Sequence, residues 1–141
     1  MIGRLLATEC AVRLLVMFVL FAVGLIHLMP LVGVLGADRL QSLYGIAIEG
    51  PDLQILMRHR AVLFGLLGVF FIVSAFLPGL QAIALAVGLV AVLSFLILAW
   101  TTDGYNASMA RVVTMDIIAL VLLLVGTAGY FIMRSRDLPI P

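Results

Sequence analysis

Residues 80–100 read LQAIALAVGLVAVLSFLILAW, an apolar run that only Gln81 and Ser94 interrupt. A helix needs about 20 such residues to cross the hydrocarbon core of a bilayer. Three further stretches approach this length, and none alternates polar and apolar residues as a barrel strand would. The sequence therefore predicts four transmembrane helices, over residues 8–29, 52–77, 80–101 and 107–133.

The composition supports this assignment. Of the 141 residues, 65% are hydrophobic and 11% are charged, whereas about 25% charge is typical of soluble domains. All the basic residues are arginines, and the formal net charge of +1 supplies no basic field for nucleic acid, so we exclude that partner. We predict an all-α membrane protein in which residues 1–141 form a single four-transmembrane-helix bundle.

The connections between the predicted helices also carry information. Asp38 and Gln41 have the spacing of a capping box, which predicts a short interfacial helix that ends at Gly45. The whole connection over residues 31–50 is too apolar for a solvated loop, so we expect it to pack as a lid over the mouth of the bundle. Pro51 suits the first turn of the next helix, since proline lacks the N–H that would be unpaired there.

An even number of spans places both termini on one side of the membrane. Arginine counting ties, but the four arginines near the termini are free to follow the positive-inside rule. These are Arg4, Arg13, Arg134 and Arg136. We therefore predict a multi-pass protein with both termini in the cytoplasm.

Ionisable residues within the predicted spans are candidates for a functional site, because an aspartate or arginine at a helix centre costs about 2.5 to 3.5 kcal/mol on insertion scales. Arg58 and Asp116 lie at similar depths below one membrane face, counting about 1.5 Å per residue. The predicted polar cluster and its rim comprise His27, Glu49, Arg58, Asn106, Arg111 and Asp116. For His27 alone, a neutral imidazole bonded to a neighbouring helix is the simpler interpretation.

The phase of the second helix predicts which arginine faces inward. Steps of three and four from Arg58 reach Ala61, Gly65 and Gly68, small residues typical of helix contacts in membranes. The same steps from Arg60 reach the larger Phe64 and Phe71, which look like a lipid-facing surface. We therefore expect Arg58 to pair with Asp116, and Arg60 to extend toward the headgroups.

No metal or cofactor is predicted. Cys10 is the only cysteine, and His27 and His59 lie on different helices without an HExxH or similar motif. Nothing in the sequence has the glycine pattern of a nucleotide-binding loop.

Several short motifs resemble a known family. They are residues 43–45 (LYG), residues 57–65 (MRHRAVLFG), residues 104–106 (GYN) and Asp116. The chain resembles a family of small bacterial four-helix inner-membrane proteins of unknown function, similar to the DoxX-like proteins. The resemblance implies a location in the bacterial inner membrane. Some members carry the label phosphopantetheine adenylyltransferase, but this sequence lacks that enzyme's paired-histidine nucleotide motif and has no lysine to meet phosphate.

Three functions fit the sequence. The first is a bundle that binds a lipid, quinone or similar amphiphile above the predicted polar cluster. The second is an accessory or structural subunit whose small-residue faces dock a membrane partner protein or a second copy of the chain. The third is a membrane-embedded enzyme of the isomerase type, with Asp116 and His27 as acid and base. We expect the first of these, with the lipid bilayer as the chain's surroundings.

Overall fold

The computed structural model describes the backbone of residues 2–136 and the side chains of residues 8–135. Within that range it contains helices and short connections, with no strand. The elements in order are α1 (Ile2–Leu28), the 3₁₀ helix η1 (Met29–Leu35), α2 (Ala37–Tyr44), α3 (Pro51–Phe76), α4 (Pro78–Trp100) and α5 (Ala107–Arg136). The predicted all-α bundle, with a short helix between the first two spans, is confirmed.

Four helical segments are long and apolar enough to cross a membrane: Thr8–Leu35, Pro51–Phe76, Pro78–Trp100 and Ala107–Ser135. The protein is therefore a multi-pass membrane protein. Pro51 and Pro78 each stand at a helix start, where a missing N–H costs nothing. The first helix begins earlier, and the last helix ends later, than predicted. Hydropathy detects only the apolar part of a helix, and these end turns lie beyond the apolar runs. The side chains of Arg4 and Arg136 lie outside the described residues.

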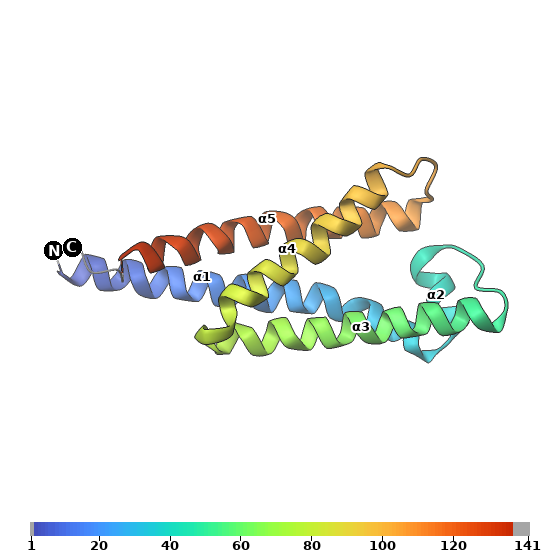
Figure 1. The fold of residues 1–141 in the computed structure, drawn as a ribbon, viewed down its shortest axis with the longest axis horizontal. Coiled ribbons are helices and arrows are strands. Elements are labelled where there is room, and N and C mark those ends of the chain that lie inside the picture. The colour runs from blue at the N-terminus through green and yellow to red at the C-terminus, as the bar shows by residue number, and fades with distance from the viewer. Residues whose placement is uncertain (1, 137–141) are drawn as a thin grey trace.

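The helices form an elongated bundle (Figure 1). α1 packs against α3 and α5, while α4 packs against α5 and α3. At one end, α1 and α5 continue past the turn between α3 and α4. At the opposite end, α2 and η1 pack beside the start of α3.

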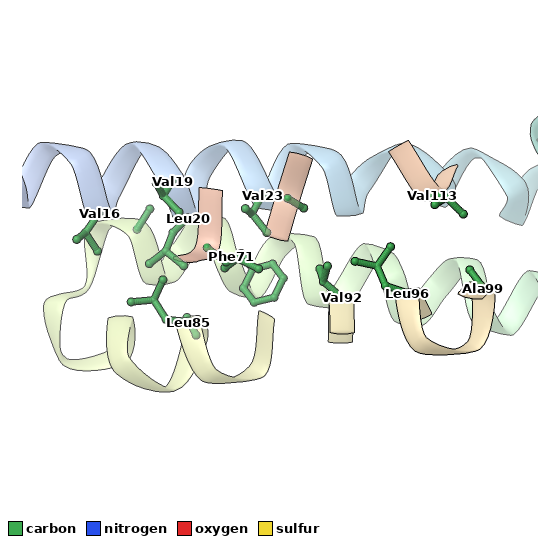
Figure 2. Packing of buried hydrophobic residues seen from close by; sticks show 14 residues of the cluster. Val16, Val19, Leu20, Val23, Phe71, Leu85, Val92, Leu96, Ala99 and Val113 are labelled. Carbon is green, nitrogen blue, oxygen red and sulfur yellow. The ribbon is translucent and has the colours of Figure 1, made fainter. Parts of the chain in front are cut away.

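The core runs along the middle of the bundle. Figure 2 shows Leu20 and Val23 of α1 beside Phe71 of α3, with Val16 farther along α1. The small residues of α3 are buried, as their spacing predicted, and they bring α1 and α3 into backbone contact. A methyl group added at Gly68 would lie 2.8 Å from the carbonyl oxygen of Gly24. In lipid, such close packing replaces the hydrophobic drive of a soluble core.

The segment between α1 and α3 differs in detail from the prediction. α2 begins after Gly36, whose φ of 144° favours glycine, and no side chain caps it, so the predicted capping box at Asp38 is wrong. The predicted end at Gly45 is confirmed: this residue has the left-handed conformation of a helix C-cap. Leu40, Tyr44 and Ile48 are buried, so the segment packs onto the bundle as expected of a lid.

Candidate functional site

A cavity of about 290 Å³ lies at the end of the bundle that carries α2. Its lining comes from the end of α1, the start of η1, the end of α2, residues 60–64 in the middle of α3, and residues 108–116 of α5. Most of its lining is apolar, including Ile26, Phe64 and Val112. Its polar groups are His27, Ser42, Tyr44, Arg60, Ser108, Arg111 and Asp116. An apolar space with a few convergent polar groups is the usual form of a small-molecule site.

His27 sits between two aromatic rings of α3. Its ring stacks on Phe64 at 5.7 Å between centroids and meets Phe71 edge-on at 5.0 Å. The side chain is 2% exposed, and its Nδ1 donates to the carbonyl oxygen of Val23 at 2.9 Å. The partner is thus in its own helix, not in a neighbouring one as the simpler interpretation supposed. A carbonyl oxygen can only accept, so Nδ1 carries the ring proton. In the neutral imidazole, Nε2 is then the nitrogen that can accept a hydrogen bond from a ligand.

Arg60 also lines the cavity from α3, with its guanidinium beside two aromatic rings. Its guanidinium lies 5.2 Å from the ring centroid of Tyr44 and 5.0 Å from that of Phe64. This is a double cation–π contact that joins α2 to α3. Phe64 therefore touches both Arg60 and His27, and holds the two polar groups in one wall of the cavity. Within residues 8–135, the Arg60 guanidinium donates no hydrogen bond.

Asp116 of α5 lines the same cavity and is 8% exposed. It shares its buried face with Ala119 and Leu123, so its predicted inward direction is confirmed. Arg60 is the cation that attracts its carboxylate. No side chain in the described part of the molecule gives that carboxylate a hydrogen bond or a close ion pair.

The predicted roles of the two arginines on α3 are wrong. Arg58 is exposed and its Nε donates to the carbonyl oxygen of Val34 at 2.9 Å, so it belongs neither to the cavity nor to a pair with Asp116. The face of α3 that carries Arg58 and the small residues packs on α1 and η1. A methyl group added at Gly65, for example, would lie 2.5 Å from Leu31. The face of Arg60, assigned to lipid, instead carries buried Phe71 and borders the cavity.

The three remaining predicted residues take different positions. Arg111 lines the cavity from α5 and donates to the Ser108 hydroxyl at 2.9 Å. Glu49 is exposed and does not line the cavity. Asn106 does not line it either, but its Oδ1 caps α5 by accepting from the Met109 N–H at 2.8 Å. Its Nδ2 donates to the carbonyl oxygen of Tyr44 at 2.9 Å, which fastens the end of α2 to the start of α5.

This double role of Asn106 predicts a graded effect. Asn106→Ala should lower the free energy of unfolding by about 2 kcal/mol, about 1 for the lost cap and about 1 for the lost tether. Asn106→Ser keeps an N-cap and should recover about half of that loss. Both variants should speed hydrogen exchange in residues 37–45, because neither holds α2. Exchange rates there equal to those of the unaltered protein would contradict the tether.

Arg60, Tyr44 and Phe64 were missed as site residues. The spacing of Arg60 and Phe64, four residues apart on one helix, is a signal that sequence reasoning had available. Tyr44 gave no comparable signal, because its position depends on how α2 packs against α3.

The assignment of this site rests on the geometry of its cavity. Comparison of the chain with models of protein families, with curated proteins and with solved structures finds no match. Groups of three or more histidine, cysteine, aspartate or glutamate side chains that could hold a metal ion are not found among the described residues.

Proposed function

We propose that this protein binds an amphiphile, such as a lipid or a quinone, with the polar head in the cavity beside His27, Arg60 and Asp116. The observation that carries the proposal is the state of Asp116. Its side chain is 8% exposed, its carboxylate oxygens are open to the cavity and attracted by Arg60, and no described residue donates a hydrogen bond to them. Polar groups in such surroundings are costly unless they are paired, and a ligand head supplies the missing partners.

The hydrogen-bonding groups that line the cavity determine which polar head of a ligand can bind there. Arg60 and Arg111 offer N–H donors, whereas Asp116 and Nε2 of His27 offer acceptors. A head with both a hydrogen-bond acceptor and an O–H or N–H donor satisfies both sets. The apolar walls around Phe64 and Val112 suit the first part of an attached chain. Quinol, carboxylic acid and glycerolipid heads meet these requirements.

The location proposed for this activity is the bacterial inner membrane, with both termini in the cytoplasm and the cavity toward the periplasm. The resemblance of residues 57–65 and the other short motifs to small bacterial membrane proteins supports the compartment. The arginines near the termini support the orientation. On that side the cavity is bordered by α2, which lies between Gly36 and Gly45 in the chain.

An accessory-subunit function is less well supported. It relied on small-residue faces free to dock a partner, but Gly68 packs on α1 and Gly88 packs on Leu123 of α5. These faces are occupied within the chain itself.

A cavity-filling substitution tests the proposal. Val112 is half-buried in the cavity wall, whereas Ile118 lies exposed on the same helix and does not line the cavity. Native mass spectrometry with monoolein and decylubiquinol as probes should show at least one of them bound by the unaltered protein. Val112→Trp should weaken that binding by about tenfold or more, since overpacking costs about 1–3 kcal/mol. Ile118→Trp is the matched control. Binding of neither probe, or equal effects of both substitutions, would overturn the proposal.

A further inference from the structure

A second, larger cavity lies at the other end of the bundle and has no part in the proposed function. Its volume is about 800 Å³, and residues of α1, α3, α4 and α5 line it. It occurs where α1 and α5 continue past the α3–α4 turn, so that the shorter hairpin leaves one side of the longer pair uncovered (Figure 1). We call this feature the terminal notch.

The terminal notch lies at the depth of lipid headgroups. Two membrane-spanning segments meet at this level: one ends at Phe76, the next begins at Pro78, and both of these residues line the notch. Arg13 of α1 and Arg134 of α5 line it beside this turn. The two helices lie side by side here, because a methyl group at Gly129 would lie 3.2 Å from Val12. Arg134 therefore lies about one helical turn closer to the chain ends than Arg13.

Hydrogen-bond donors from three helices line the terminal notch. Arg13 comes from α1 and Arg134 from α5. Arg134 Nη1 donates to the Tyr130 hydroxyl oxygen at 3.5 Å, which leaves the phenolic O–H free to donate. Gln81 of α4 is nearly buried, and its Nε2 donates one hydrogen to the carbonyl oxygen of Ala75 at 3.2 Å. The second hydrogen of that amide remains to be used.

Among the described residues, Glu9 is the one acid that lines the terminal notch, so the charge of this described lining is positive, with two arginines against one carboxylate. The remaining lining is apolar and includes Leu14, Met17 and Phe76. Convergent donors with excess positive charge recognise an oxyanion, and the apolar wall beside them suits an acyl chain. Basic pockets between transmembrane helices bind anionic headgroups in this way.

We propose that the terminal notch binds the phosphodiester of an anionic glycerophospholipid from the membrane leaflet on the side of the termini. Arg13 and Arg134 bind the phosphate oxygens, with Tyr130 and Gln81 as further donors. Glu9 accepts from a headgroup hydroxyl. The acyl chains lie along Leu14 and Phe76 toward the middle of the bilayer.

Native mass spectrometry of the purified full chain tests this site, with dioleoylphosphatidylglycerol as the probe. Arg13→Gln combined with Arg134→Gln should weaken binding by about 30-fold, since each arginine near a membrane surface contributes a factor of about five. Arg39→Gln combined with Arg58→Gln removes the same charge at the opposite end and should change the affinity less than twofold. Equal losses in the two double variants would show general attraction to an anionic surface and overturn the proposal.

Two further probes define the ligand. Dioleoylphosphatidylethanolamine carries the same phosphodiester with an added ammonium group and should bind about tenfold more weakly, because the ammonium faces two arginines. Equal affinity for the two lipids contradicts selection of an anion. Inorganic phosphate at 10 mM should not displace the lipid, and displacement would show a free-phosphate site instead.

A measurement on the unaltered protein covers the case in which the double variant does not fold. Phosphatidylglycerol with a diazirine in its headgroup should label residues 9–17 and 130–134 on irradiation. Labelling spread evenly over all four membrane-spanning helices would overturn the proposal.

Discussion

Gly68→Ala is expected to lower the free energy of unfolding by about 2–3 kcal/mol, the upper part of the range for overpacked sites. The added methyl group would lie 2.8 Å from the Gly24 carbonyl oxygen and 2.8 Å from Cγ of Leu28. Leu28 can change rotamer, but the carbonyl oxygen belongs to the backbone of α1 and moves only if the helix moves. The substitution therefore separates α1 from α3 along their whole contact. Unfolding by denaturant in mixed micelles measures the loss.

Gly79→Ala is the control for this experiment. Gly79 is also helical, in the first turn of α4, but a methyl group there meets nothing within 4 Å. Alanine has the better helix propensity, so Gly79→Ala should be neutral or stabilise by up to about 1 kcal/mol. Equal stability of the Gly68→Ala and Gly79→Ala variants would contradict a close backbone contact.

The reciprocal change at Gly24 gives a second check. A methyl group there would lie 2.9 Å from the Gly68 carbonyl oxygen and 2.6 Å from Cγ1 of Ile72. Because both substitutions push the same two helices apart, the double variant should lose less than the sum of the two single losses.

The parts of the fold that depend on local chemistry were predictable. Four apolar runs of membrane-crossing length predicted the spans, and Pro51 and Pro78 marked helix starts. The inward direction of Asp116 followed from the small residues on its own face of α5. Each of these signals lies within one helix, where hydropathy and side-chain periodicity are sufficient.

Which of the two arginines, Arg58 or Arg60, faces the site depended on tertiary structure. Their neighbours on α3 suggested one packed face of small residues and one lipid face of large ones. In fact α3 buries both: the small residues contact α1, and the aromatic ones surround His27 and border the cavity. Which buried face held the polar site depended on the positions of α2 and α5, and no pattern within α3 contains that information.

The capping box failed for a related reason. Asp38 and Gln41 had the right spacing, but the chain leaves η1 through Gly36, and this places the start of α2 one residue before Asp38. The 3₁₀ helix that sets this register contains Pro30 in its first turn and has no hydropathy signal of its own.

The revised assignment of the arginines leads to a second large effect, on the proposed ligand. Arg60→Gln should weaken binding of monoolein by about 10- to 100-fold, because a hydrogen bond from a charged donor contributes about 1.5–3 kcal/mol. Arg58→Gln removes the same charge two residues away, at an exposed side chain that bonds Val34, and should change affinity less than twofold. Isothermal titration in detergent measures both.

The Arg60→Lys variant separates the effect of the positive charge from the effect of the planar guanidinium. Arg60→Lys keeps the positive charge but loses the planar group that lies over the rings of Tyr44 and Phe64. Tyr44→Leu removes one of those rings and should weaken monoolein binding by about fivefold, equivalent to about 1 kcal/mol of cation–π energy. If the rings position the guanidinium for the ligand, Arg60→Lys and Tyr44→Leu should show a non-additive combined loss. Additive losses, or a loss with Arg58→Gln as large as with Arg60→Gln, would contradict the assignment of Arg60 to the ligand head.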